Sequence, residues 1–434
     1  MPTTLRAKLT VPGDKSISHR AAILAALAAG KSVIRGFAPG NDCAATLRCL
    51  RLLGVNAIRD GDKLYIDSEG PRSLHEPQDI LDCANSGTTM RLMAGVLASR
   101  PFMSVLTGDA SLRARPMGRV VDPLRSMGVL IDGREGGTKA PLYIRGPKAG
   151  TPLFPLTGYR LPVASAQVKS CLLLASLFAD GTSYIIEIAP TRDHTERLLR
   201  LLGVDLVVQE TELGRVISLQ GGQSLTPVDI EIPGDFSSAA FWLAAGALIP
   251  GSEVRLEKVG LNPLRTGLLS VLKRMGCDIR VSQEKDHFEP VGDIVIRGGE
   301  LNGTTVEPEE VPGMVDEIPV FAVCAAAARG RSMVRGAGEL RNKESDRIHA
   351  IVDNLRRMGA EAGELQDGFW VEGGRPLRGN LIQTHGDHRI AMAFAVAGLI
   401  AEGETVLDQQ ECIDVSYPGF LELLQRLKGG GLDT

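Results

Sequence analysis

The sequence predicts an α/β protein of two domains, each built from three similar units of strands and helices. Three observations favour this fold class. The chain has 434 residues, which is more than one hydrophobic core usually serves. A short helical phrase ending in glycine recurs along it. Each good copy is followed by two extended segments joined by a polar turn.

The recurring phrase combines apolar residues at helical spacing with a glycine, which suits the left-handed end of a helix. It reads "LRLLGV" at 50–55, "LRSMGV" at 124–129, "LRLLGV" at 199–204, "LKRMGC" at 272–277 and "LRRMGA" at 355–360. Its glycines are separated by 74, 75, 73 and 83 residues. A degenerate sixth copy, "LLQRLKGGG", lies near the C-terminus. Spacing this regular indicates an internal repeat.

The segments around each phrase complete the unit. Alternating residues flank a glycine turn in "AIRDGDKLYID" (57–67) and "AEAGELQDGFWVEG" (360–373), which predicts two paired strands. An Ala-rich helix passes into a strand in "LAAGKSVI" and "FADGTSYII". Each unit is therefore roughly strand, helix, strand, helix, strand, strand. Six such units make two pseudo-symmetric halves, with the junction near 231–238.

Composition excludes several function classes. The net charge of −4 provides no basic field for nucleic acid or an anionic membrane. The seven cysteines are scattered and never form C-x-x-C, which favours reduced thiols in a cytoplasmic protein. No signal segment is recognisable, and the most apolar run, 390–401, is too short to cross a bilayer.

Residues 11–30, "VPGDKSISHRAAILAALAAG", look like a phosphate-binding loop that leads into a helix. A Walker loop requires glycine directly before its lysine, but Asp14 stands there. The stretch therefore offers Lys15, Ser16 and Arg20 at a helix start without the features of an ATP site. His19 has no assigned role.

Three further clusters in the first half combine polar or basic residues with a helix start. Asn85 to Thr89 precede a helix that we expect to begin near Met90. Ser165 to Ser170 stand at the front of another helix, and "TRDHTER" (191–197) contains Arg192. The segment 106–119 holds three arginines in a predicted loop. A plain helix cap or a solvated basic loop would also explain any one of them.

The second half supplies carboxylates and a histidine in the same positions. Asp316 and Glu317 precede a very apolar helix, where an acid either complements the helix dipole or is desolvated enough to transfer protons. "RNKESDR" (341–347) and "HGDHR" (385–389) precede two more helices. His385 and His388 have H-x-x-H spacing, but no further ligands join them, so we expect no metal.

The common placement of these clusters is more informative than any one of them. If the repeat directs the helix starts into one cleft, their dipoles add to the Arg and Lys charges. Such a cleft would bind small polyanions and provide groups for proton transfer. No signature for hydride transfer, ATP hydrolysis or acyl transfer is present.

Seven motifs together resemble the 5-enolpyruvylshikimate-3-phosphate (EPSP) synthase family. They are "GDKSISHR", "NSGTTMR", "ARPMGR", "SAQVKS", "DEIP", "NKESDR" and "GDHRIAM", in family order along essentially the whole chain. "TRDHTER" and "DEIP" resemble its more divergent bacterial branch.

The resemblance implies a two-domain inside-out α/β barrel with six βαβαββ units, three in each domain. Domain I would comprise residues 1–12 and 233–434, and domain II residues 13–232, with the active site in the cleft between them. No metal or cofactor is implied. We expect a cytoplasmic monomer that binds neither nucleic acid nor membrane.

The resemblance also implies the reaction: phosphoenolpyruvate gives its enolpyruvyl group to the 5-hydroxyl of shikimate 3-phosphate and releases phosphate. The residues implied for shikimate 3-phosphate are Lys15, Ser16, Arg20, Ser165, Ala166, Gln167, Arg192, Asp316 and Lys343. The residues implied for phosphoenolpyruvate are Lys15, Asn85, Gly87, Arg115, Gln167, Arg347 and Arg389.

The implied catalytic residues are Asp316, Glu344, Lys15 and His388. Asp316 is the candidate base for the hydroxyl proton, and Glu344 the candidate acid for the methylene carbon. Lys15 and His388 would assist the loss of phosphate. Arginine suits both substrates because its fork binds carboxylate and phosphate bidentately.

Some residues depart from the family pattern. Val415 stands where many members have lysine, which removes one expected contact to phosphoenolpyruvate. Leu92 replaces a proline of plant-like members. Gly87 has no side chain to exclude the inhibitor glyphosate, which favours sensitivity, whereas the branch resemblance leaves the response open.

The nearest alternative is UDP-N-acetylglucosamine 1-carboxyvinyltransferase, which has the same fold and donor. That family begins its first motif with Lys-Asn and usually has a cysteine in the Arg-rich loop. Here Lys15 precedes Ser16, and 106–119 contains no cysteine. A non-catalytic anion-binding protein is the alternative from another class, which Asp316, Glu344 and His388 disfavour.

Overall fold

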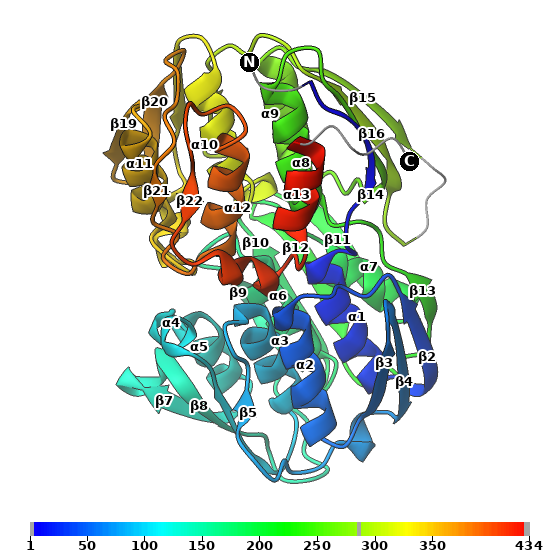
Figure 1. Cartoon of the computed structure of the whole chain (residues 1–434). Helices are drawn as coiled ribbons and strands as arrows, with labels where there is room; N and C mark the ends of the chain where they lie inside the picture. The colour runs from blue at the N-terminus through cyan, green and yellow to red at the C-terminus, as the bar shows by residue number, and fades with distance from the viewer. Residues whose placement is uncertain (1–3, 284–287, 429–434) are drawn as a thin grey trace. The chain divides into compact units, whose positions relative to one another are not determined.

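The computed structural model describes residues 4–283 and 288–428 and divides into two compact bodies. Body I comprises Met1–Gly13 and Pro233–Thr434, and body II comprises Asp14–Ile232. Each body is a mixture of helices and small sheets (Figure 1). The chain is therefore a two-body α/β protein.

Body II begins at a helix and ends at a short strand. Its elements are α1 (Lys15–Leu27), β2 (Ala29–Arg35), α2 (Asn41–Leu52), β3 (Asn56–Asp60), β4 (Lys63–Glu69), β5 (Leu81–Asp82), α3 (Gly87–Leu97), β6 (Met103–Thr107), α4 (Ala110–Ala114), α5 (Gly118–Ser126), β7 (Leu130–Arg134), β8 (Lys139–Arg145), β9 (Thr157–Arg160), α6 (Ala166–Ser176), β10 (Thr182–Glu187), α7 (His194–Leu201), β11 (Leu206–Thr211), β12 (Gly214–Gln220) and β13 (Asp229–Glu231).

Body I combines the first strand of the chain with its second half. Its elements are β1 (Arg6–Thr10), α8 (Phe236–Leu248), β14 (Glu253–Gly260), α9 (Gly267–Arg274), β15 (Asp278–Gln283), β16 (Val291–Arg297), β17 (Thr305–Val306), α10 (Ile318–Ala327), β18 (Arg331–Val334), α11 (Arg347–Arg357), β19 (Glu361–Leu365), β20 (Gly368–Glu372), β21 (Leu381–Ile382), α12 (His388–Ala397), β22 (Val406–Leu407) and α13 (Phe420–Lys428). The described residues also form five short 3-10 helices: η1 (Pro71–Ser73) and η2 (Glu135–Gly137) in body II, and η3 (Val311–Gly313), η4 (Gly338–Asn342) and η5 (Gln410–Val415) in body I.

The four-stranded sheets share one strand order. In β5-β6-β8-β7 the first pair is parallel and the other two pairs are antiparallel, and β9-β10-β12-β11 and β17-β18-β20-β19 repeat this pattern. In the two other four-stranded sheets, the first strand is distant in sequence from the rest, as if the two sheets had exchanged it. The N-terminal strand β1 pairs with β14 in body I, and β13 pairs with β2 in body II. The strands β21 and β22 form a parallel pair.

The most apolar helices lie at the centre of each body. In body I, α8, α10 and α12 pack on one another, and every residue of α8 is buried. In body II, α3 packs on α1 and α6. Strands such as β4 instead alternate buried and exposed residues. A helix that is apolar all round belongs in a core, whereas an alternating strand has one solvated face.

The glycine of each recurring phrase ends its helix as predicted. Gly54, Gly128, Gly203, Gly276 and Gly359 have φ between +87° and +105°, the left-handed region that only glycine enters without strain. The paired strands predicted after the phrase at 57–67 and 360–373 are β3 with β4 and β19 with β20. The glycines of the degenerate sixth copy lie outside the described residues.

Two predictions about local structure were wrong. The segment 106–119 is not one loop, because it contains α4 and the start of α5; Asp109 accepts a hydrogen bond from the Leu112 backbone N–H at 2.8 Å and caps α4. The helix expected near Met90 begins at Gly87, because Ser86 accepts from Thr89 N–H and is its cap. Among the described residues, no helix has the length and apolar character needed to cross a membrane.

Candidate active site

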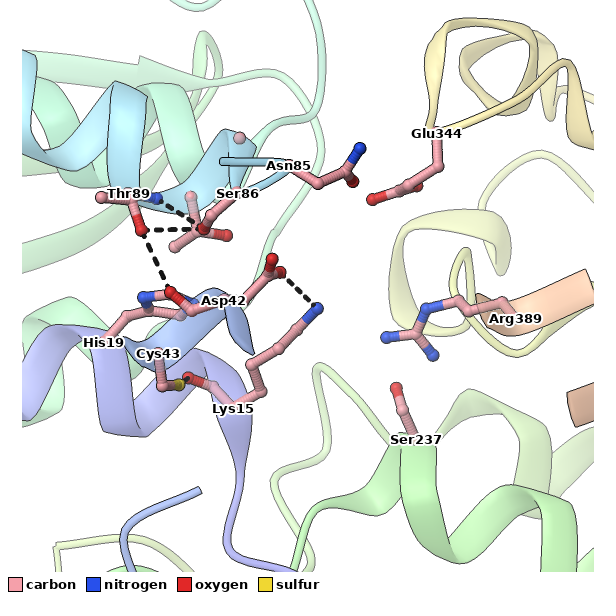
Figure 2. A network of polar contacts seen from close by, with 12 residues as sticks. Lys15, His19, Asp42, Cys43, Asn85, Ser86, Thr89, Ser237, Glu344 and Arg389 are labelled. Atoms are coloured by element: carbon pink, nitrogen blue, oxygen red, sulfur yellow. Dashed lines mark hydrogen bonds and ion pairs between the residues drawn. The ribbon is translucent and has the colours of Figure 1, made fainter. Parts of the chain in front are cut away.

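The start of α1 is capped by a side chain and carries two of the predicted site residues. Asp14 Oδ1 accepts a hydrogen bond from the Ile17 backbone N–H at 2.9 Å, so the residue that rules out a Walker loop serves as the N-cap. Lys15 Nζ lies 3.0 Å from Asp42 Oδ2 of α2 (Figure 2). Lys15 and Ser16 are the first two residues of the helix.

Arg20 connects three helices of body II. Its side chain is buried, and it donates from Nε to Thr195 Oγ1, from Nη2 to Ser170 Oγ and from Nη1 to the Ser16 carbonyl, each at 2.8 Å. Ser170 and Thr195 are 2.7 Å apart through their hydroxyls. Arg20 therefore holds the starts of α1, α6 and α7 in register.

The start of α3 gathers four predicted residues. Arg115 Nη2 donates to Asn85 Oδ1 at 3.1 Å. A Cβ on Gly87 would lie 2.8 Å from Arg91 Nη1 and 3.0 Å from Arg115 Nη1. Gln167 accepts from Arg91 Nη1 at 2.6 Å. Asn85, Gly87, Arg115 and Gln167 are therefore brought together around one additional arginine, Arg91.

The polar residues at the start of α6 were predicted either to cap the helix or to contribute to an anion site. The cap is confirmed. Ser165 accepts from the Val168 backbone N–H and is the N-cap, and Ala166 is the first helical residue. Gln167 points its amide towards α3, donating to Thr88 Oγ1 at 2.8 Å. Arg192 is half-buried in the segment between β10 and α7.

A chain of polar side chains links α1, α2 and the start of α3, and Figure 2 labels three of its members, His19, Ser86 and Thr89. His19 Nδ1 lies 2.7 Å from Thr46 Oγ1, Thr46 lies 2.7 Å from Thr89 Oγ1, and Thr89 donates to Ser86 Oγ at 2.8 Å. Burial, followed by the charges of Lys15 and Arg20, holds the pKa of His19 well below 6.5. His19 is therefore a neutral structural residue of this network.

In body I the predicted acids gather around Arg347. This buried side chain donates to Asp387 from Nε at 2.8 Å, to Glu344 from Nη2 at 2.6 Å and to Asp316 from Nη1 at 3.4 Å. Burial acts to lower the pKa of Arg347, but the three carboxylates outweigh it and raise that pKa. Arg347 is therefore charged, and it fixes both candidate catalytic carboxylates, Asp316 and Glu344.

Arg389 holds Asp316 from a second direction. Its Nε lies 3.6 Å from Asp316 Oδ1, and its Nη1 donates to the Asp316 carbonyl at 3.3 Å and lies 3.9 Å from Glu317 Oε1. Arg389 and Asp316 thus form a second guanidinium–carboxylate pair next to Arg347. Figure 2 shows the Arg389 guanidinium extended from its helix.

The two remaining predicted residues of body I stand at element ends. Lys343 directly follows η4. His388 is the first residue of α12 and is 2% exposed, and Asp387 before it caps that helix by accepting from Arg389 N–H at 2.9 Å.

Sequence reasoning assigned no role to Arg91 or Asp387. Arg91 follows Gly87 by one helical turn, so its proximity to that residue was readable from the motif. Asp387 occupies an N-cap position, which was also readable, but its bonds to Arg347 depend on tertiary packing. Among the described residues, no group of three or more His, Cys, Asp or Glu side chains could hold a metal ion.

Comparison with known proteins agrees with the resemblance. The family model of EPSP synthase (3-phosphoshikimate 1-carboxyvinyltransferase) matches residues 1–424. The 3-phosphoshikimate 1-carboxyvinyltransferase of Herpetosiphon aurantiacus is 49% identical over 98% of this chain and 97% of that relative, and the one of Pelotomaculum thermopropionicum is 51% identical over 98% and 96%. The 2.37 Å structure of EPSP synthase from Acinetobacter baumannii is 42% identical and superposes with a TM-score of 0.85, covering 98% of this chain and 96% of that one. The chain therefore belongs to the EPSP synthase family.

Proposed function

We propose that this protein transfers the enolpyruvyl group of phosphoenolpyruvate to the 5-hydroxyl of shikimate 3-phosphate, giving 5-enolpyruvylshikimate 3-phosphate and phosphate. The reaction belongs to the shikimate pathway to chorismate and the aromatic amino acids. One observation in this member of the family carries the proposal. Arg347 Nη1 and Arg389 Nε lie 3.4 and 3.6 Å from the same carboxylate oxygen, Asp316 Oδ1.

The finer architecture that we propose is an inside-out barrel of six βαβαββ units. It is supported by the central position of the apolar helices and by the shared order of the four-stranded sheets. Body I would be domain I and body II domain II, and the active site would lie in the cleft between them. The anion-binding helix starts would face that cleft.

Shikimate 3-phosphate would bind mainly to body II. Its phosphate would lie at the starts of α1, α6 and α7, where backbone N–H groups, Ser16, Ser165 and the cations are available. The residues proposed for this substrate are Lys15, Ser16, Arg20, Ser165, Ala166, Gln167 and Arg192 from body II, with Asp316 and Lys343 from body I. Asp316 and Lys343 would hold the hydroxyl side of the ring.

Phosphoenolpyruvate would use cations of both bodies. Lys15, Asn85, Gly87, Arg115 and Gln167 would contact it from body II, and Arg347 and Arg389 from body I. A planar guanidinium pairs bidentately with a carboxylate or a phosphate. Offsetting the negative charge of both substrates allows them to approach each other.

The addition step requires two proton transfers. Asp316 would take the proton of the 5-hydroxyl while this oxygen bonds to C2 of phosphoenolpyruvate. Glu344 would give a proton to C3, which changes from methylene to methyl. The product of this step is a tetrahedral adduct that still carries phosphate.

The elimination step reverses one of these transfers. The methyl group would return its proton to Glu344, and the electron pair of that C–H bond would form the C2–C3 double bond. The bond between C2 and the phosphate oxygen would break at the same time, and phosphate would leave with its electron pair. Lys15 and His388 would assist by stabilising the leaving group.

Binding of phosphoenolpyruvate would prepare Glu344 for its role as an acid. In the described structure Glu344 is paired with Arg347 at 2.6 Å, which favours the charged carboxylate. The substrate carboxylate would compete for the same guanidinium and bring a negative charge close to Glu344. Both changes favour the protonated form.

The experiment that tests the function is a phosphate-release assay with phosphoenolpyruvate and one acceptor at a time. We expect release with shikimate 3-phosphate and none with UDP-N-acetylglucosamine. The opposite pattern would contradict the proposal and favour the sister enzyme. Asp316→Asn and Glu344→Gln should lower kcat by about 10²–10⁴-fold, and wild-type turnover by both would refute their roles.

We also propose that the enzyme acts as a cytoplasmic monomer and that glyphosate competes with phosphoenolpyruvate. All seven cysteines are free, which fits a reducing compartment. Size-exclusion chromatography with light scattering would test the monomer.

A further inference from the structure

A buried ion cluster lies behind the proposed phosphate site of body II. Its members are Lys169 of α6, Glu187 at the end of β10 and Glu196 of α7, and all three side chains are fully buried. Lys169 Nζ lies 3.0 Å from Glu187 Oε1 and 2.7 Å from Glu196 Oε1. The reaction proposed above uses none of these three residues.

The cluster holds the backbone next to Arg192. Lys169 Nζ donates to the Thr191 carbonyl at 3.2 Å, so the ammonium binds the backbone at Thr191 as well as pairing with two carboxylates. Thr191 also donates to Glu187 Oε1, from its backbone N–H at 3.2 Å and from its hydroxyl. Thr191 is therefore fixed by α6 on one side and by β10 on the other.

The far side of Arg192 is fixed as well. Thr195, three residues further on, accepts from Arg20 and lies 2.7 Å from Ser170 Oγ. Segment 188–193, which connects β10 to α7, is thus tied to α6 next to Arg192 by Lys169, and the start of α7 that follows it is tied to α6 by Ser170. The same helix begins with the proposed substrate residues Ser165, Ala166 and Gln167.

Stability alone does not account for this cluster. Two buried carboxylates share one ammonium, and Arg215 Nη1 lies 4.0 Å from Glu187 Oε2. Burial raises the pKa of Glu187, with the charge of Glu196 adding to this, although Lys169 opposes it. Apolar side chains of similar volume often stabilise a core as well as a buried ion pair does. What they cannot supply is the bond to the Thr191 carbonyl.

We infer that Lys169 is a positioning residue for the phosphate of shikimate 3-phosphate: it holds segment 188–193 against α6 so that Arg192 reaches the phosphate bound at the starts of α6 and α1. The inference rests on the proposed function, in which Arg192 contacts that phosphate. Lys169 itself touches no substrate.

The test uses a variant that removes one positive and one negative charge from the cluster, so that its net charge is unchanged. Lys169→Leu alone would leave two buried carboxylates without their ammonium. The informative variant is K169L/E196L, in which the one remaining carboxylate, Glu187, keeps its bonds to Thr191 and has Arg215 Nη1 at 4.0 Å. We expect it to fold, to raise the KM for shikimate 3-phosphate about tenfold, and to leave the KM for phosphoenolpyruvate and kcat at saturating substrate within about twofold. The matched control is K139L/E135L, an exposed pair of the same body 3.1 Å apart, with no expected change.

A second comparison tests whether Lys169 acts through Arg192. In an R192Q background, K169L/E196L should change the KM for shikimate 3-phosphate by less than about twofold, because the two sites share one effect. Amide hydrogen exchange across segment 188–193 should be faster in K169L/E196L than in wild type.

The outcomes separate the inference from the function on which it rests. An active wild type with an unchanged KM in folded K169L/E196L would overturn the inference and leave the proposed function intact. A full tenfold effect in the R192Q background would also overturn it. Absence of phosphate release by the wild type with shikimate 3-phosphate would refute the proposed function and the inference together.

Discussion

The arginines at the candidate site are bonded to different kinds of partner in the two bodies. In body II, Arg20 donates to two hydroxyls and a carbonyl, and Arg91 donates to an amide oxygen and backbone carbonyls. In body I, Arg347 donates to three carboxylates, and Arg389 lies within 4 Å of two. Lys15, paired with Asp42, is an exception in body II.

This difference suggests a division of labour. A neutral acceptor orients a guanidinium without cancelling its charge, so Arg20 and Arg91 remain attractive to a phosphate dianion. A carboxylate cancels the charge of a guanidinium and can also accept or donate a proton. The carboxylates of body I are therefore suited to the reacting centre. We therefore expect substitutions in body II to act mainly on KM and those in body I mainly on kcat.

The largest expected effect is that of Arg347→Gln. It removes the charge that holds Asp316, Glu344 and Asp387 together, and kcat should fall on the order of 10³-fold. The measurement is steady-state phosphate release, with circular dichroism to confirm folding. Arg357→Gln, an exposed arginine on the same helix paired with half-buried Asp353 at 2.6 Å, should stay within about twofold. An intact kcat with a raised KM would contradict the division.

Arg20→Gln should have the next largest effect. Loss of its charge and its bonds to Ser170 and Thr195 should raise the KM for shikimate 3-phosphate about 10²-fold, because bonds to charged groups contribute about 1.5–3 kcal/mol each. The change in kcat should be much smaller. Arg51→Gln, which loses one bond to the Ala57 carbonyl, is the control. A fall in kcat without a change in KM would break the comparison.

Gly87→Ala should have a moderate effect, mainly on the binding of phosphoenolpyruvate. The added methyl would lie 2.8 and 3.0 Å from two guanidinium nitrogens, which must shift. The KM for phosphoenolpyruvate and the inhibition constant for glyphosate should both rise, and kcat should change little. Gly299→Ala, where no atom lies within 4 Å of the new methyl, is the control. Unchanged constants would show that phosphoenolpyruvate and glyphosate bind elsewhere.

The smallest effect concerns stability and comes from His19→Asn. The pKa of His19 is held below 6.5 in the folded protein, so the unfolded chain binds a proton more readily. Below pH 6.5 the wild type should lose up to about 1.4 kcal/mol of unfolding free energy per pH unit from this group. Urea unfolding between pH 7.5 and 5.5 should show a steeper loss for wild type than for H19N. An equal loss of unfolding free energy with falling pH in wild type and H19N would refute the neutral, buried state of His19.

The parts of the structure that depend on local sequence were predictable. Gly54 and its four counterparts end helices because left-handed backbone is a local requirement, and Asp14 and Ser165 cap helices through bonds to nearby N–H groups. The segment 106–119 differs from the predicted loop because Asp109 caps a helix there, and an aspartate at that position is a local N-cap signal.

The partners of the site residues could not be predicted from spacing. Arg91 bonds to Gln167 across 76 positions, and Arg347 to Asp387 across 40. Lys169 looked like a residue at a polar helix front, yet it is fully buried between two glutamates. Such contacts depend on which helices pack together, and a single sequence does not encode that in any local pattern.

The exchange of strands between the sheets has a consequence for how the chain acquires its structure during synthesis. The partner of β1 is β14, and Leu5 bonds to Ser252, 247 positions later. At a translation rate of about 5–20 residues per second, β1 must wait on the order of ten to fifty seconds for its neighbour. The charged Arg6 and Lys8 alternate along it and discourage pairing with a wrong strand edge in that interval. A fragment of residues 14–232 contains every strand of its own sheets, whereas one starting at residue 233 lacks a strand that was made first.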